Sequence, residues 1–278
     1  MAEERIPGTP NIIDISAGVL HIYNFEPMCT LVVGGYLKRM HPTTRKQINT
    51  IIYHSEAAAT YPTIGSFFSK RSLDASVGTM LIKNIIIEPG FKEIGSSAFS
   101  KREELEHVVI PDTITTINQQ AFYGCKRLTN IEIPANIQYL GAYAFALTGI
   151  KEFTLYINSH DIYKVKHTGN HDNLIQPCYE MFRSCFNLKK LTIKATVFPT
   201  EKEHKISLDS LGIVNDANKL QFIRFAKTRT AKGELERLAC PLEMVIAPKK
   251  VFDFKELYQE YKNARGIAIY ENVKVFED

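Results

Sequence analysis

Apolar residues recur along this chain with two nested spacings. Within short segments they occupy positions 1, 4 and 6, as in "IKNIII", "LEHVVI" and "LTNIEI", and these segments begin 23 residues apart, at Ile82, Leu105 and Leu128. An Ala-Phe pair follows each segment at the same interval, at Ala98-Phe99, Ala121-Phe122 and Ala144-Phe145. The alternation within each segment predicts a strand, and a fixed period in this range predicts stacked coils that form a solenoid.

Each recurring residue type has a physical reason to recur. A coil of this length cannot bury its own apolar side, so equivalent Leu, Ile and Phe side chains must stack on the next coil, about 4.8 Å away, and form interior columns. Proline follows the strand-like segments and ends their pairing, at Pro89, Pro111, Pro134 and Pro248. Cys125 and Cys185 stand three residues after Phe122 and Phe182, which favours core filling over a redox or catalytic role.

Less regular copies of the same segment extend the pattern in both directions. Upstream, "INTIIY" from Ile48 is followed by "IGSFFS" at 64–69, which is similar to "IGSSAFS" at 94–100. Downstream copies are "IKEFTL", "LKKLTI", "LQFIRF" and "LEMVIA", which begin at Ile150, Leu188, Leu220 and Leu242. We therefore predict a solenoid over residues 48–250, with clean repeats at 82–147 and degenerate repeats at 188–250.

The two ends lack the repeat and are predicted to cap it. In residues 1–47, "IIDISAGVLHIYNF" and "CTLVVGGYLKRM" read as strands divided by a turn near Pro27. In residues 251–278, Asp253 and Glu256 have capping-box spacing before an amphipathic helix that Gly266 would end. We expect a strand cap at the first end and a helix-strand cap at the second, with partner binding by that helix as the alternative.

Composition narrows the class of protein. The chain has 278 residues, 45% of them apolar, and a formal charge of +4, which is too small to indicate nucleic acid. It has no apolar run long enough to span a membrane, and "MAEERIPGTP" lacks the features of a secretory signal. Five cysteines without a CxxC pair argue against disulfides and a zinc ribbon. We expect a cytoplasmic protein, with a virion or a host cell as other possible locations.

An insertion over residues 157–178 interrupts the repeats and is the one place where chemistry would concentrate. It holds His160, Asp161, His167, His171 and Asp172, and a polar loop is favoured over a metal site because Gly169-Asn170 indicates a turn between the last two histidines. An enzyme that pairs Cys178 with a histidine is the alternative. Because GxSxG, HExxH and phosphate-loop motifs are absent, we predict no enzyme, no catalytic residue, no metal and no cofactor.

The full repeat pattern, LxxIxIPxxIxxIxxxAFxxCxxL, as in "LEHVVIPDTITTINQQAFYGCKRL", resembles the BspA-like class of leucine-rich repeats. The resemblance implies a β-rich α/β fold, a right-handed leucine-rich-repeat solenoid with a parallel sheet on one face. It also implies a role in binding proteins or surfaces. Members of this class include adhesin-like and cell-surface proteins of microbes, and the repeats also occur in viruses.

If positions 1, 4 and 6 of each strand point inward, positions 2 and 5 contribute to the outer face of the sheet, with position 3 beside them where the strand bends. That face changes from an apolar end to an acidic middle and a basic far end, a mixture that suits a protein partner better than a polyanion. A merely solvated sheet is the equal alternative. The candidate binding residues are Ile86, His107, Val109, Asn130, Glu132, Glu152, Lys189, Lys190, Phe222 and Arg224.

The partner of this face is expected to be another protein or copies of the same chain, with no nucleic acid, membrane or small-molecule substrate evident. The leading hypothesis is a non-enzymatic binding or structural protein. A virion or other assembly component, in which the N-terminal segment joins neighbouring subunits, is the first alternative. An adhesin-like surface protein is the second.

Overall fold

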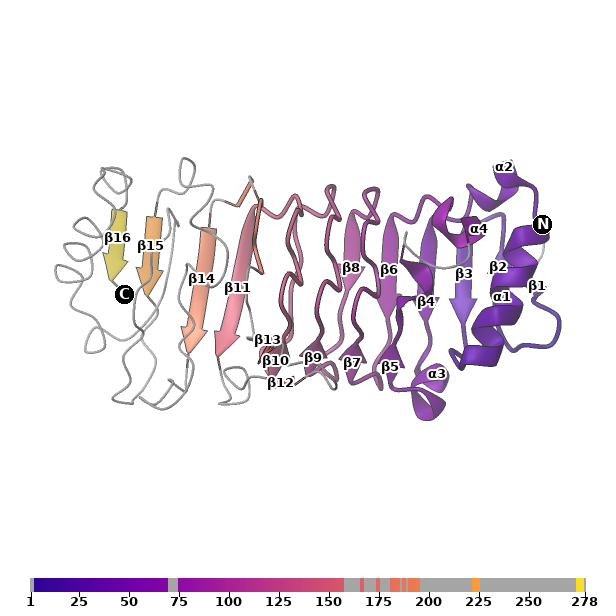
Figure 1. The fold of residues 1–278 in the computed structure, drawn as a ribbon, viewed down its shortest axis with the longest axis horizontal. Coiled ribbons are helices and arrows are strands. Elements are labelled where there is room, and N and C mark those ends of the chain that lie inside the picture. The colour runs from indigo at the N-terminus through magenta and orange to yellow at the C-terminus, as the bar shows by residue number, and fades with distance from the viewer. Residues whose placement is uncertain are drawn as a thin grey trace.

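The protein forms an elongated stack of coils with strands side by side along its length (Figure 1). The structure is a computed structural model that describes residues 3–69, 75–157, 166–167, 174–175, 181–185, 187–188, 190–195, 222–225 and 274–277. The first and last of its strands, β1 (Glu4–Arg5) and β16 (Lys274–Glu277), lie at opposite ends of the stack.

The front layer begins with a six-stranded sheet of order β1-β2-β3-β4-β6-β8. The added strands are β2 (Ile12–Asp14), β3 (Val19–Ile22), β4 (Thr50–Tyr53), β6 (Asn84–Ile87) and β8 (His107–Val109). β1, β2 and β3 pair antiparallel, whereas β3, β4, β6 and β8 pair parallel in regular register. The first parallel strand therefore lies at 19–22, upstream of the predicted start of the repeats.

A second front sheet continues the array in the order β11-β14-β15-β16, all parallel. Its other members are β11 (Glu152–Ile157), β14 (Lys190–Ala195) and β15 (Phe222–Phe225). A four-stranded parallel sheet of short strands runs along the lower edge of the stack in Figure 1, with β5 (Thr63–Ile64), β7 (Glu93–Ile94), β9 (Thr116–Ile117) and β10 (Tyr139–Leu140). The coils of β4, β6 and β8 are thus paired in both sheets.

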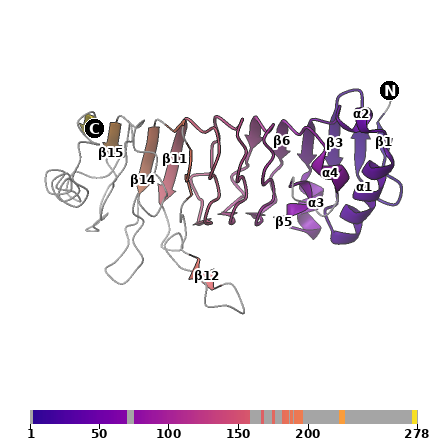
Figure 2. The ribbon, with the colours of Figure 1, turned by 45° about the horizontal axis from the view of Figure 1, so that its top comes forward.

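The insertion contributes a small hairpin-like pair of its own. β12 (Lys166–His167) and β13 (Leu174–Ile175) pair antiparallel as a separate two-stranded sheet. β12 projects away from the stacked coils (Figure 2). Residues 160, 171 and 178, where the sequence offers His160, His171 and Cys178, lie outside the described residues.

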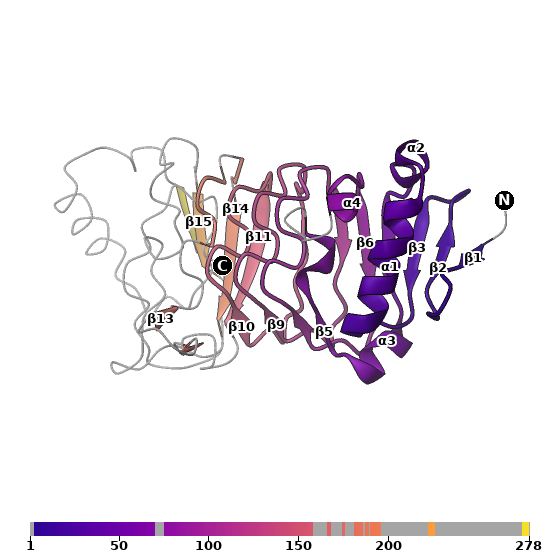
Figure 3. The ribbon, with the colours of Figure 1, turned by 45° about the vertical axis from the view of Figure 1, so that its right-hand side comes forward.

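The predicted strand at 29–40 is wrong, because this segment lies in helix α1 (Pro27–Arg39). Its Val-Val pair favours a strand and its Gly-Gly pair disfavours a helix. Val33 and Leu37, however, are four residues apart and both are buried, which places them on one helical face. Pro27 at the start and Lys38 and Arg39 in the last turn suit a helix. α1 runs beside β3, roughly along the strand direction (Figure 3).

The other helices of the described residues are short and belong to the first coils. They are α2 (Pro42–Arg45), α3 (Ser55–Thr60), α4 (Ala75–Gly78) and a 3-10 helix at Ser66–Phe68. α4 contacts α1 and the 3-10 helix, so the helices gather at the N-terminal end of the array. The predicted C-terminal helix over 254–265 lies outside the described residues.

The interior columns predicted from the repeat are confirmed. Positions 1, 4 and 6 are buried in the coils that begin at Ile82, Leu128 and Ile150, and in the coil from Leu105 the later two positions are partly buried. The rings of Phe99, Phe122 and Phe145 are fully buried and stack with centroids 5.4 and 5.5 Å apart. The column continues to Phe182, 6.2 Å from Phe145. Cys125 and Cys185 are buried beside this column, as expected for core fillers.

The prediction of a strand in "LTNIEI" at 128–133 is wrong. Leu128, Ile131 and Ile133 are buried as the pattern requires, yet no strand is assigned there. Within the described part of the chain, the backbone N–H and C=O groups of residues 130–133 make no hydrogen bond with other backbone groups. The front layer is therefore divided between β8 and β11, although burial holds the intervening coil in the stack.

Candidate functional site

The N-terminal part of the outer front face is fixed by the strand register. One row across the sheet runs His21, Ile52, Ile86 and Val109, and the row beside it runs Val19, Thr50, Asn84 and His107. Ile86 is half-buried between its neighbours, whereas Val109 on the edge strand β8 is 55% exposed. His107 is also exposed. The structure thus brings together Ile86, Val109 and His107 on one face.

The middle and far parts of the predicted face do not continue the ladder of the N-terminal part. Asn130, Glu132 and Glu152 are all exposed, and Glu152 lies opposite Lys190 in the β11–β14 register. Phe222 and Arg224 belong to β15, where they pair in register with Lys274 and Phe276 of β16. Residue 189, a lysine in the sequence, lies outside the described residues. Because the sheet is divided, Val109 and Glu132 share no ladder.

A groove opens where the two front sheets fail to meet. It has a volume of about 440 Å³ and is lined by Asn130, Ile131, Glu132, Ile133, Glu152, Phe153, Thr154 and Tyr156. One side is the coil that lacks a strand, and the other side is β11. A volume of this size lies within the ~300–1,000 Å³ of ordinary ligand sites.

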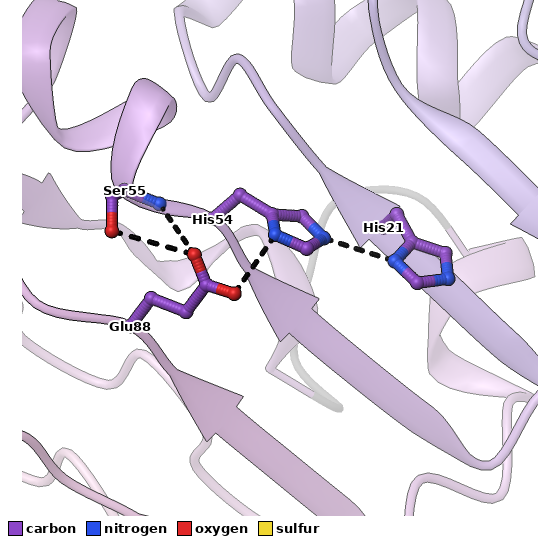
Figure 4. A network of polar contacts seen from close by, with 4 residues as sticks. All are labelled: His21, His54, Ser55 and Glu88. Carbon is purple, nitrogen blue, oxygen red and sulfur yellow. Dashed lines mark hydrogen bonds and ion pairs between the residues drawn. The ribbon is translucent and has the colours of Figure 1, made fainter.

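Sequence reasoning missed a polar network at the other end of the face. Nδ1 of His21 is 2.9 Å from Nε2 of His54, and Nδ1 of His54 is 3.0 Å from a carboxylate oxygen of Glu88 (Figure 4). The second carboxylate oxygen of Glu88 accepts from the backbone N–H of Ser55 at 3.0 Å. The ring of Tyr23 stacks on that of His54 with centroids 4.1 Å apart.

The strand register explains how these residues meet. Tyr53 pairs with both Ile22 and Ile87, so the residues that follow, Tyr23, His54 and Glu88, leave three neighbouring strands at the same end. A sequence alignment that included 19–22 as a repeat strand would have placed them together. Interpreting residues 1–47 as a cap without repeats hides this signal.

The charges of the network follow from its geometry. Burial acts to raise the pKa of Glu88, but the Ser55 N–H and the neighbouring His54 outweigh it, and the pKa falls below its ordinary value. Burial, followed by the nearby His54, lowers the pKa of His21. With Glu88 on its Nδ1, a neutral His54 carries the proton there and accepts the Nδ1–H of His21 at Nε2. The network is therefore a directed chain of hydrogen bonds ending on an ionised carboxylate.

A possible metal cluster overlaps this network. Among the described residues, ligand atoms of His54, Glu56 and Glu88 lie within 4.8 Å of one another. Both oxygens of Glu88 already accept hydrogen bonds that tie β6 to the start of α3. The arrangement thus serves to order the coil ends, and it is separate from the histidines that the sequence placed in the insertion.

Stacked coils with parallel strands and an interior column of phenylalanines are typical of leucine-rich repeats. Residues 77–171 match the family described as BspA type leucine rich repeat region, in 6 copies, and this segment is a repeat region of that type. No helix in the described part of the chain has the length and apolar character needed to cross a membrane.

Two solved structures are similar to this chain. The pneumococcal vaccine antigen PcpA is 19% identical, with a TM-score of 0.41, over 72% of this chain and 42% of the antigen. A leucine-rich repeat protein from Bacteroides ovatus is 16% identical, with a TM-score of 0.28, over 84% of each chain. The chain therefore spans less than half of the pneumococcal antigen. No curated protein sequence matches it significantly.

Proposed function

We propose that the protein is a non-enzymatic binding protein whose outer front face contacts another protein. The observation that supports this most is the exposed Val109 beside Ile86, on a sheet whose register fixes both side chains. Apolar groups held on a rigid surface with exposed polar neighbours such as His107 and Glu132 are typical of a protein contact.

The proposal also includes the handedness of the solenoid, its caps and its place of action. We take the solenoid to be right-handed, as parallel crossover connections almost always are, with its two ends closed by non-repeat segments. We also propose an intracellular place of action.

A second candidate function is assembly through the N-terminal segment. On α1, Met28 is 70% exposed and Leu31 is 67% exposed, with Val32 beside them. These side chains lie one turn apart on a single helical face, which suits contact with a second copy in a larger assembly, such as a virion. Light scattering at several protein concentrations tests it, because higher-order species that Leu31→Lys removes would support assembly and a strict monomer would rule it out.

The leading proposal is tested by finding what touches the front face. A photocrosslinking amino acid at Val109 should capture a partner in native extract, whereas the same amino acid at Gln138, an exposed residue beside β10 of the separate β10-β9-β7-β5 sheet, should not capture it. The captured protein is then purified and its affinity for the chain is measured.

The double variant Val109→Lys with Glu132→Lys is expected to abolish binding of that partner. It replaces an exposed apolar group and inverts a charge, and both sites are at the surface, so the melting temperature should move by no more than a few degrees. Gln138→Lys is the matched control and should bind normally. Unchanged affinity in the double variant would place the interaction elsewhere on the molecule.

A further inference from the structure

The division of the front layer leaves a coil without strand partners. In the parallel sheets, each strand exchanges backbone hydrogen bonds with its neighbours, as β6 does with β4 and β8. Residues 130–133 run between β8 and β11, yet in the described part of the chain their backbone groups make no such bond. β8 and β11 are accordingly edge strands of two separate sheets, both beside this coil.

Unpaired backbone groups at a strand edge are a template for pairing with another strand. Such groups strongly favour a partner, since a backbone N–H or C=O removed from water without one costs free energy. Here the template is accessible from the surface, because the groove of about 440 Å³ runs between residues 130–133 and β11. The N–H of Lys151 donates to the C=O of Thr129 at 3.0 Å, so the two coils meet at one end of the groove and separate beyond it.

The side chains that line the groove indicate which chemical class of molecule would bind there. Ile131, Ile133 and Phe153 are buried and form its floor, whereas Asn130 and Glu132 are exposed beside it. Asn130 offers a side-chain amide and Thr154 a hydroxyl for hydrogen bonding. The carboxylate of Glu132 makes no ion pair with a described residue, so it favours a cation in the occupant.

We propose that an extended, lysine- or arginine-bearing segment of a partner protein enters this groove and pairs as a strand with residues 130–133. The inference rests on the proposed function and specifies its chemistry. Backbone pairing supplies the affinity and the alternate side chains supply the selectivity, with a basic side chain on Glu132. A groove of this volume suits a short stretch of extended chain rather than a folded domain.

The test uses the full chain and a synthetic octapeptide in which lysine alternates with valine and threonine. Amide hydrogen exchange of residues 130–133 is followed without and with excess peptide, and fluorescence anisotropy of the labelled peptide gives its affinity. We expect fast exchange at 130–133 in the free protein and exchange at least about tenfold slower with peptide, since hydrogen-bonded amides are protected.

Two controls separate strand pairing from simple charge attraction. The same peptide with alternate backbone amides N-methylated keeps its charge but loses donors, and it should bind at least about tenfold more weakly. Glu132→Lys should weaken the unmodified peptide by a similar factor, whereas Gln138→Lys should not. Equal binding of the two peptides, or no slowing at 130–133, would overturn the proposal. Protection of these amides already in the free chain would also overturn it, because another part of the same chain would then occupy the groove.

The outcome also separates this inference from the proposed function. If the peptide leaves 130–133 unprotected while a crosslinker at Val109 still captures a partner, the front face binds a protein by side-chain contacts alone and only the strand site is lost. If the peptide protects 130–133 and nothing is captured from Val109, the strand site stands and the broader binding face is wrong.

Discussion

The residue three positions after Phe99, Phe122 and Phe182 donates a hydrogen bond to the phenylalanine carbonyl of the preceding coil, whereas Thr148, three positions after Phe145, donates to Phe145 of its own coil. Nε of Arg102 donates to the C=O of Phe68 at 2.6 Å, and the Cys125 thiol donates to Phe99 at 3.3 Å. The Cys185 thiol donates to Phe145 at 3.1 Å. The position thus selects a buried donor and tolerates side chains as different as cysteine and arginine.

Arg102 makes more hydrogen bonds at this position than the cysteines do. Its guanidinium is fully buried and also donates to the carbonyls of Met80, at 2.9 Å, and Val77, at 2.7 Å. Burial lowers its pKa to about 10. One side chain therefore satisfies three backbone carbonyls of the preceding coil, which the charged run "SKREELE" does not reveal.

Replacing Arg102 should be severely destabilising. Arg102→Met keeps much of the volume but leaves the buried carbonyls of Phe68 and Met80 without a described donor, whereas that of Val77 keeps the N–H of Met80. At about 1–3 kcal/mol for each unsatisfied group we expect a loss of at least about 2 kcal/mol. Urea denaturation measures it, with Lys126→Met as the control because Lys126 is an exposed cation in the following coil. A loss below about 1 kcal/mol would mean that water replaces the guanidinium.

Phe122 is the central ring of the column. It lies between Phe99 and Phe145 at 5.4 and 5.5 Å, so its removal opens a cavity that both neighbours border. Phe122→Ala is expected to cost about 3–5 kcal/mol, as large core truncations do. Thermal and urea unfolding test this, and Leu81→Ala, at an exposed position, should have little effect. A melting temperature shifted by a degree or less would contradict the assigned column.

At the scale of the coil, tight turns recur on both sides of the same phenylalanine. The residue two positions before it has positive φ at Ser97, Gln120 and Tyr143, and the residue two positions after it at Lys101, Gly124, Leu147 and Ser184. Only Gly124 adopts this conformation without steric cost. Sequence patterns therefore located the coils but not their turns, because stacking imposes the backbone conformation on residues whose own preference is different.

Close contacts between the backbones of neighbouring coils require glycine for a different reason, because they leave no room for a Cβ. A Cβ on Gly141 would lie 2.2 Å from the backbone nitrogen of Gln119 in the preceding coil, whereas a Cβ on Gly35 in α1 would meet nothing within 4 Å. Gly141→Ala should cost about 1–3 kcal/mol or more because two backbones must separate. Gly35→Ala should stabilise by about 1 kcal/mol through helix propensity. Chemical denaturation measures the free energy of unfolding of both variants. Equal changes in the two variants would show that the coils separate at Gly141 without cost.

The elements that sequence reasoning predicted are those whose signal is a burial pattern. β6, β8 and β11 follow from apolar positions 1, 4 and 6, and these positions are buried even at 128–133, where no strand forms. Burial can be read from such a pattern, but hydrogen bonding between two backbones depends on their separation, which the pattern does not encode. The same limit explains why the groove and the His21–His54–Glu88 network were missed, whereas the outward placement of Val109 and Glu132 was predicted.

At the scale of the whole molecule, stability should fall as the pH is lowered from 7.5 to 5. The folded pKa of His21 lies below its ordinary value of 6.5, so the unfolded chain binds more protons in the window just below that value and is favoured there. Glu88, with its pKa below 4.5, adds a second loss only in stronger acid. His21→Asn should reduce the loss between pH 7.5 and 5, measured by urea midpoints. An identical pH dependence in the variant would mean that His21 is not responsible.

The divided front layer also has a mechanical consequence. Hydrogen bonds between coils run along the long axis of the stack, so a pull on its two ends loads them in series. The coils of β4, β6 and β8 share ladders in both sheets, but across 130–133 the front ladder is missing. Toward β8 the load falls on the β9–β10 pair and the phenylalanine column, and toward β11 it falls on the column and the few hydrogen bonds such as that from Lys151 to Thr129. Under tension we expect this joint to part before the junctions between the coils of β4, β6 and β8. The place where a partner strand is proposed to bind is thus also the place where that strand would reinforce the molecule against force.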